Sequence, residues 1–173
     1  MQKGEGVTKF NLVFEKGPNE FSRLDIMNLM SCREDLYRLG LIGTSGKYCD
    51  KDDSACITVG YGNVSQLVRR IADGRHIFAV SGTRTGNKSQ LTEYDYTTVL
   101  EYDPRRNYVK ARGHIEPSSE SMTHGAIYDI ISSSGSVVHV HDHDSRLWKV
   151  RHEMGIPMTA LGVNMELLRW LKK

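Results

Sequence analysis

Three histidines alternate with other residues between Ser136 and Asp144, at positions His139, His141 and His143. In a β-strand, side chains at i, i+2 and i+4 point to the same face, so the three imidazoles would share one face. Two such imidazoles can bind one divalent ion, and catalytic zinc commonly has three protein ligands with one position open for water. The alternative interpretation is a solvated strand end that is rich in histidine. The flanking valines favour a partly buried strand, in which polar side chains need partners.

Ser118, Ser119 and Glu120 lead directly into a segment with helical spacing. Hydroxyl groups and free backbone N–H groups at the start of a helix form a natural site for an anion. Three interpretations of Glu120 stay open: it is a metal ligand, a general base, or only an acidic residue that suits the helix dipole. His124 lies one helical turn after Glu120 and would share its face, and the simplest reading of it is a partly buried polar contact.

Two loops combine glycine with small polar residues. Gly60–Ser65 offers Gly62 for close approach of the backbone and the Asn63 amide as a hydrogen-bond donor. Ser81–Ser89 follows an expected strand, and such a loop can hold a phosphate through its amides with basic side chains nearby. Its relevant residues are Gly82, Thr83, Arg84, Gly86 and Lys88. A single loop of this kind is usually an ordinary turn. The occurrence of both loops in order with the serine and histidine segments is a more specific indication of a binding site.

The first third of the chain is expected to hold a strand, a helix and a loop. Val7–Phe14 alternates apolar and polar residues, as a half-buried strand does. Glu20–Leu39 has mostly helical spacing of its apolar residues, and Gly40 ends it as a C-cap residue would. These apolar residues are Phe21, Leu24, Met27, Leu36 and Leu39. Gly43–Gly60 is polar and is expected to be a surface loop.

The remainder of the chain carries several strand signals. Ser65–Gly74 fits the strand and helix periods equally, and Pro104 lies in a turn that joins two alternating runs into a hairpin. Strands are expected over Arg75–Gly82, Thr97–Asp103, Asn107–Gly113 and Gly135–His141, and helices over Met122–Ile131, Ser145–Gly155 and Asn164–Lys173. This order favours helices packed on a largely antiparallel sheet over alternating βαβ units.

Composition limits the class of protein. The 173 residues suit one domain with a proper core, and a net charge of +2 gives no reason to expect nucleic acid as a partner. No apolar run approaches the ~18 residues that span a bilayer, and the N-terminus lacks a signal peptide. Cys32, Cys49 and Cys56 form an odd set that is expected to stay reduced. These features predict a cytoplasmic protein without a membrane segment.

The joint order of the motifs resembles the class II aldolase/adducin family. That family shows G-N-[VI]-S, a strand ending in a Ser-Gly or Thr-Gly turn, S-S-E before a helix, and V-[VI]-H-x-H. Here these segments are Gly62–Ser65, Ser81-Gly82, Ser118–Glu120 and Val137–His141, and the likeness runs from about Phe21 to the end. The resemblance implies an α/β fold with α/β/α layers, in which helices flank a central, mostly antiparallel sheet.

The resemblance also implies a metal-dependent aldolase, epimerase or dehydratase that acts on a small phosphorylated sugar. His139 and His141 would bind a divalent ion, usually Zn²⁺, and Glu120 would serve as the acid/base. The phosphate would be held by Asn63, Ser81, Gly82, Ser118 and Ser119. Family members often form four-fold rings, so a homo-oligomer, and a tetramer in particular, is expected.

The sequence departs from the family near its C-terminus. Residues 1–173 are expected to form a single domain that lacks the family's final strand and helix, and with them the third histidine ligand. His143 is the first candidate for that place, and His124 and His152 are the alternatives. A catalytic tyrosine, often given by a neighbouring subunit, has no clear match either. Three accounts stay open: a working lyase or isomerase, a catalytically inactive adducin-like domain that works in assembly or binding, and a shortened relative without defined activity.

Overall fold

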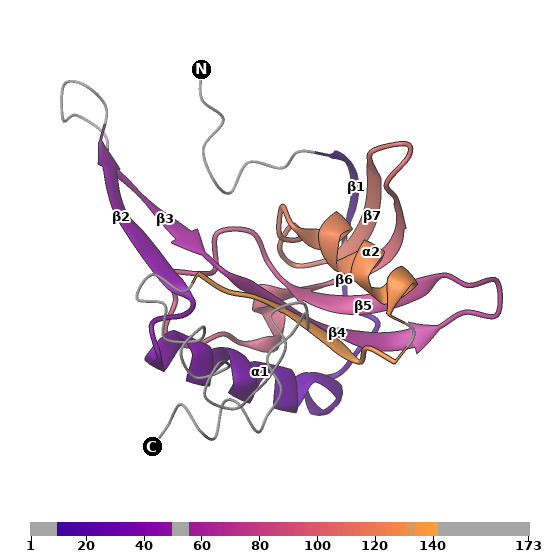
Figure 1. The fold of residues 1–173 in the computed structure, drawn as a ribbon, viewed down its shortest axis with the longest axis horizontal. Helices are drawn as coiled ribbons and strands as arrows, with labels where there is room; N and C mark the ends of the chain where they lie inside the picture. The colour runs from indigo at the N-terminus through magenta and orange to yellow at the C-terminus, as the bar shows by residue number, and fades with distance from the viewer. Residues whose placement is uncertain (1–9, 50–55, 132, 142–173) are drawn as a thin grey trace.

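The computed structural model describes residues 10–49, 56–131 and 133–141. Figure 1 shows a central sheet, a two-stranded hairpin and two α-helices in this part of the chain. In chain order the elements are β1 (Asn11–Lys16), α1 (Arg23–Arg38), β2 (Gly43–Cys49), β3 (Cys56–Tyr61), β4 (Asn63–Arg70), β5 (His76–Ser81), the 3₁₀ turn η1 (Glu93–Asp95), β6 (Tyr96–Asp103), β7 (Tyr108–Gly113), α2 (Ser121–Ile130) and β8 (Ser136–His139).

The central sheet is mixed. Its strand order is β1-β7-β6-β5-β4-β8, with β1 parallel to β7 and the other four neighbouring pairs antiparallel. The α/β class is therefore confirmed, and the mostly antiparallel sheet is confirmed in part. The parallel pair of β1 and β7 was not predicted because these strands are far apart in the sequence. Parallel neighbours can be joined only by a long connection, which leaves no local signal of their pairing.

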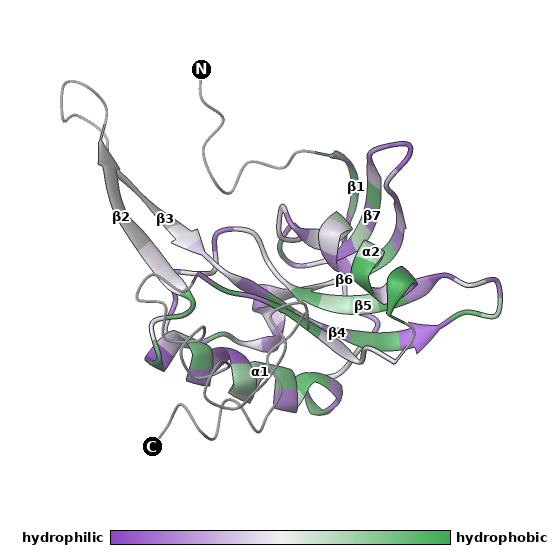
Figure 2. Cartoon of the chain, viewed as in Figure 1, coloured by the Kyte–Doolittle hydropathy of each residue, from purple (hydrophilic) through white to green (hydrophobic). Residues whose placement is uncertain are grey.

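One helix covers each face of the sheet in the described chain. On one face, Ile26 and Leu36 of α1 belong to the same buried cluster as Ala79 of β5. On the other face, Tyr128 of α2 packs with Phe78. Consecutive residues of β5 thus face opposite helices, as the alternation of a strand requires. Figure 2 shows apolar residues along α2 and the covered strands, and hydrophilic residues in the turn between β6 and β7.

Helix α1 ends close to where the sequence predicts and begins three residues after the predicted start, at Arg23. The Ser22 hydroxyl accepts from the Asp25 N–H, and the Asp25 carboxylate accepts from the Ser22 N–H at 2.7 Å, which makes a capping box. Gly40 follows the C-cap with a φ of 71°, a conformation that favours glycine. Two apolar residues of the helical pattern lie outside the core, however, because Leu24 is 77% exposed and Met27 is 55% exposed.

The expectation of a surface loop over Gly43–Gly60 is wrong. β2 and β3 form an antiparallel pair there, with Gly43 opposite Tyr61 and Cys49 opposite Cys56. Ile57 and Val59 alternate with other residues at its end, a short strand signal that the polar residues before it outweighed. Residues 50–55 between the two strands lie outside the described part.

The other expected elements agree with the structure where it describes them. The hairpin of β6 and β7 is present, and the ambiguous segment from Ser65 is the strand β4, which pairs on both sides with β5 and β8. The last expected strand ends earlier than predicted, at His139. The expected helices Ser145–Gly155 and Asn164–Lys173 lie outside the described residues.

Candidate functional site

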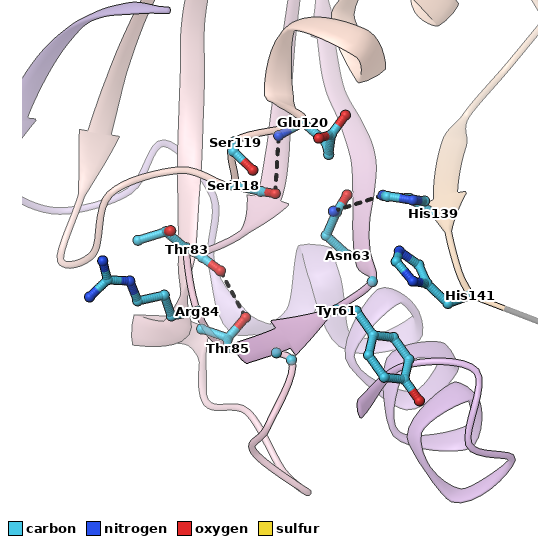
Figure 3. A pocket seen from close by; sticks show the side chains of 14 residues that line it. Tyr61, Asn63, Thr83, Arg84, Thr85, Ser118, Ser119, Glu120, His139 and His141 are labelled. Carbon is cyan, nitrogen blue, oxygen red and sulfur yellow. Dashed lines mark hydrogen bonds between the residues drawn. The ribbon is translucent and has the colours of Figure 1, made fainter. Parts of the chain in front are cut away.

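A pocket lies where the loops after β3 and β5, the start of α2 and the end of β8 meet (Figure 3). Seven of the sequence-predicted site residues line it, from four separate segments of the chain. They are Asn63, Gly82, Ser118, Ser119, Glu120, His139 and His141, and the other lining residues are Gly60, Tyr61, Gly62, Thr83, Arg84, Thr85 and Gly86. We refer to Gly82–Gly86 with Ser118 and Ser119 as the loop side, and to Tyr61, Asn63, His139 and His141 as the histidine side.

Main-chain hydrogen bonds assemble the loop side. Gly82 forms an isolated antiparallel bridge with Pro117, and the Thr83 N–H donates to the Glu116 carbonyl at 2.8 Å. These contacts place the turn after β5 beside Ser118. A Cβ on Gly82 would lie 2.5 Å from the Ile115 side chain, so only glycine fits at this bridge.

The turn Gly82–Gly86 has a strained and closely packed backbone. Arg84 has a φ of 60°, which a residue with a side chain rarely adopts, and the Thr85 hydroxyl donates to the Gly82 carbonyl at 2.8 Å. A Cβ on Gly86 would lie 2.7 Å from both the backbone N and O of Tyr61. The turn therefore packs directly against the backbone at the end of β3, which joins the two sides of the pocket.

The Ser118–Glu120 segment starts helix α2. Ser121 donates to the Ser118 carbonyl through its N–H at 3.1 Å and its hydroxyl at 2.7 Å, and the Glu120 N–H donates to the Ser118 hydroxyl at 3.3 Å. Glu120 is the N-cap residue, without a side-chain capping bond. Its half-buried carboxylate instead accepts from the Thr123 hydroxyl at 3.2 Å, and it lines the pocket on the same side of α2 as Ser119.

Ring contacts organise the histidine side. In the pairing of β4 with β8, Asn63 is opposite His139, and the Asn63 amide nitrogen lies 3.2 Å from His139 Nδ1. His141 follows β8, and its N–H donates to the Leu41 carbonyl at 3.0 Å. The ring centroids of His139 and His141 are 5.1 Å apart, and His141 stacks on Tyr61 at 4.8 Å. Two imidazoles are thus held together at one wall of the pocket.

Ser81 and His143 differ from the other predicted site residues. Ser81 is buried, does not line the pocket, and accepts from the Val64 N–H at 3.1 Å through its hydroxyl. In this structure its side chain holds β5 to β4. His143 and His152, two of the three candidates for a further metal ligand, lie outside the described residues.

His124, the remaining candidate, lies in a buried network under the histidine side. Its Nδ1 is 2.7 Å from the Ser65 hydroxyl, which is 2.8 Å from the Tyr128 hydroxyl. Burial, with a smaller contribution from the charge of His139, lowers the pKa of His124 to about 3, and burial raises the pKa of Tyr128. His124 is therefore neutral at physiological pH, and its role in this structure is that of a buried polar contact.

Several lining residues have little signal in the sequence. Tyr61, Gly60 and Thr85 lie within the two candidate loops but were not themselves predicted as site residues. Tyr61 comes just before β4, and His141 comes just after β8. The pairing of β8 with β4 therefore brings the two rings together. A short sequence motif does not contain that information.

The chain belongs to the class II aldolase/adducin family. A comparison with protein-family models matches residues 52–169, more than half of the chain, to the Class II Aldolase and Adducin N-terminal domain. This match confirms the family to which the four motifs point. Neither the search of curated proteins nor that of solved structures gave a significant match. None of the helices in the described residues is long and apolar enough to cross a membrane.

The divalent metal that the family usually binds finds two donors here. Asn63 Oδ1 is buried and has no hydrogen-bond partner within the described chain. After a half-turn of this amide, Oδ1 would accept from His139 Nδ1–H, which is the kind of contact by which outer-shell partners orient metal-binding histidines. His139 and His141 therefore fit a divalent ion, but residues 10–49, 56–131 and 133–141 contain no group of three His, Cys, Asp or Glu that could hold one.

Proposed function

We propose that this protein is a metal-dependent lyase or isomerase that acts on a small sugar phosphate, by aldol cleavage or epimerisation. The observation that carries the proposal is the pocket itself, which gathers the serine pair, Glu120 and two histidines from segments far apart in the sequence. Hydroxyls and main-chain amides on one side suit a phosphate, and imidazoles beside a carboxylate suit proton transfer next to a carbonyl.

Each side of the pocket has a distinct role in this proposal. Ser118, Ser119 and Gly82 of the loop side bind the phosphate together with Asn63 of the histidine side, and Ser81 keeps β4 and β5 in register behind them. Binding at the phosphate, remote from the reacting carbons, fixes the position of those carbons. Glu120 accepts a proton from a substrate carbon or hydroxyl and returns it.

His139 and His141 hold the divalent ion, with Zn²⁺ as our first choice, and His143 is the proposed third ligand. When bound, such an ion stabilises negative charge on a substrate oxygen. The chain's own contribution is to keep the two rings fixed, through the Asn63 contact and the stack on Tyr61.

Metal analysis tests this proposal. We expect purified protein supplied with Zn²⁺ to bind close to one ion per chain, and the double variant His139→Ala, His141→Ala to bind none. His114→Ala is the matched control, because His114 is exposed and does not line the pocket. Turnover of a panel of ketose phosphates should follow the metal content. A wild-type protein that binds no ion under these conditions would rule out the metal-dependent enzyme.

A second candidate function is that of a catalytically inactive, adducin-like domain that acts in assembly. The observation in its favour is the pair of exposed apolar side chains on α1, Leu24 and Met27, which suits a contact with another protein surface. This function predicts a stable homo-oligomer, a tetramer by family resemblance, without turnover of any sugar phosphate. Sedimentation of the wild type and of Leu24→Lys, Met27→Lys would show whether this surface forms the contact.

A further inference from the structure

Arg33 is a buried cation directly behind the loop side of the pocket. Arg33 is only 1% exposed, although it lies in the middle of α1, where most arginine side chains would reach solvent. The guanidinium donates to the carbonyls of Thr85 at 2.9 Å, Gly86 at 3.2 Å and Ser89 at 3.1 Å. It also lies 5.0 Å from the ring centroid of Tyr37. Helix α1 thus holds the turn after β5 from behind.

The charge of Arg33 has no carboxylate partner among the residues that the structure describes. Its hydrogen bonds go to neutral carbonyls, and no ion pair includes it. Asp95, a nearby acid, is bound to Lys88 at 2.5 Å instead. Burial lowers the pKa of Arg33, but an arginine stays protonated in a protein. A buried charge without a counterion is costly, so an anion on the far side of the turn would stabilise it.

The orientation of the peptide groups in this turn also favours an anion on the side away from Arg33. The carbonyls of Thr85 and Gly86 point toward Arg33, and all peptide bonds in the described chain are trans. In a trans peptide the N–H points opposite to the C=O. The N–H groups of Gly86 and Asn87 therefore point away from Arg33, and neither has a hydrogen-bond partner among the described residues.

These two nitrogens lie against Gly60 at the edge of the pocket. A Cβ on Gly60, which lines the pocket with Gly86, would lie 2.8 Å from the Asn87 nitrogen and 2.9 Å from the Gly86 nitrogen. The turn held by Arg33 therefore packs directly against the backbone of this wall of the pocket. The side chain of Arg84, the basic residue that lines the pocket, extends away from the histidines in Figure 3. The positive charge behind this turn is thus that of Arg33.

We propose that Arg33 is a positioning residue for the phosphate subsite, which fixes the turn Gly82–Gly86 at the wall of the pocket and gives the subsite its preference for a phosphate dianion. This inference rests on the proposed function, since it assumes a phosphorylated substrate. It adds a residue that does not line the pocket and acts through the backbone that does. The same chemistry would serve free phosphate and the phosphate group of a sugar.

Calorimetric titration with inorganic phosphate tests the role of Arg33. We expect Arg33→Met to raise the Kd of the wild-type protein for phosphate by about tenfold or more, which corresponds to ~1.4 kcal/mol. Arg33→Lys keeps the charge without the planar fork and should raise the Kd by only about threefold. Arg23→Met is the control, because Arg23 lies in the same helix with a side chain 68% exposed, and its Kd should equal that of the wild type.

The lysine variant separates this role from a merely structural one. If Arg33 only holds the turn, Arg33→Lys and Arg33→Met should weaken phosphate binding equally, and this result would overturn the inference. Circular dichroism and thermal melts establish that each variant is folded, and Arg33→Lys against wild type suffices if the methionine variant does not fold. A folded Arg33→Met with wild-type phosphate affinity would also overturn it and leave the proposed function intact. A wild-type protein that binds no phosphate would instead refute the phosphate subsite itself.

Discussion

The two sides of the pocket are built in different ways. The loop side consists mainly of backbone, held by the bridge of Gly82 with Pro117, by the Thr83 hydrogen bond and by Arg33 from behind. The histidine side consists of side-chain rings at the end of β8, the last strand of the described sheet. The geometry of the loop side therefore depends on close backbone packing, whereas the geometry of the histidine side depends on contacts between particular side-chain rings.

This difference separates binding from chemistry. A chain could lose its metal or its acid/base and keep the loop side unchanged, so that the fold and an anion subsite persist without turnover. The enzyme and the assembly domain are therefore distinguished on the histidine side and at Glu120. Four predictions test whether the two sides are as independent as their construction indicates.

The largest expected effect is that of Glu120→Gln. Removing a general acid/base typically costs ~10²–10⁴-fold in rate, so kcat on an accepted sugar phosphate should fall by that factor. Metal content and the Kd for phosphate should stay within about twofold of wild type, since both sides of the pocket are unchanged in shape. Glu116→Gln, an exposed neighbour outside the pocket, is the control for kcat. Full turnover in Glu120→Gln would show that another group moves the proton.

Gly86→Ala should damage the loop side alone. Its Cβ would lie 2.7 Å from the backbone of Tyr61, and overpacking of this kind costs about 1–3 kcal/mol. We expect phosphate affinity to fall by roughly tenfold and unfolding free energy, measured in urea, to fall by that amount. Metal binding should remain near wild type. Gly135→Ala, which has open space around it, should change none of these quantities. A loss of metal in Gly86→Ala would show that the sides are coupled.

The pH dependence of stability should come from the network under the histidine side. The pKa of His124 is about 3 in the folded protein and near 6.5 when unfolded, so the unfolded chain binds the extra proton between these values. Stability is then full above pH 6.5 and decreases as the pH falls toward 3. Between pH 7 and pH 5 the expected loss is about 2 kcal/mol.

Urea unfolding at pH 7 and pH 5 measures this loss. His124→Gln should be less stable at pH 7 and should lose about 2 kcal/mol less than wild type between the two pH values. His114→Gln, at an exposed position, should keep the wild-type dependence. If His124→Gln follows the wild-type curve, the pH dependence arises elsewhere.

Tyr61→Phe should have the smallest effect. It removes the hydrogen bond from the Tyr61 hydroxyl to the Gly40 carbonyl, 3.1 Å, and keeps the ring that stacks on His141. We expect a loss of about 1 kcal/mol in unfolding free energy and no change in metal content. Tyr37→Phe, whose hydroxyl bond is longer and exposed, should change stability less. Metal loss in Tyr61→Phe would mean that the hydroxyl, rather than the ring, orders the histidine side.

The parts of the site that the sequence predicts are those whose chemistry lies within a few neighbouring residues. Ser118–Glu120 and His139-x-His141 are of this kind, because the start of a helix and the alternation of a strand fix side chains locally. Arg33 could not be found in this way. A single arginine in an amphipathic helix is ordinarily solvated, and its burial depends on the turn Thr85–Ser89, which follows more than fifty residues later.

The elements of the fold that the sequence predicts are likewise those whose signal lies within a few neighbouring residues. β5 is the short apolar run of a buried strand, β6 and β7 carry apolar alternation, and Gly40 ends α1 as predicted. The hairpin β2–β3 was missed because its apolar alternation is confined to Ile57 and Val59, in a segment that is otherwise polar. Leu24 and Met27 share the helical period with buried residues, yet they face outward, since which side of α1 meets the sheet is set by Ile26 and Leu36.

The parallel pairing of β1 with β7 has a consequence for synthesis of the chain on the ribosome. Asn11 finds its partner Tyr108 only after roughly a hundred further residues have been made. Until then Phe10 and Phe14, which pack in the cluster under α2, have no surface to cover them. The nascent chain therefore carries an unpaired, apolar strand through most of translation. We expect this segment to stay outside the sheet until β7 has been made, and to be open to chaperone binding for that time.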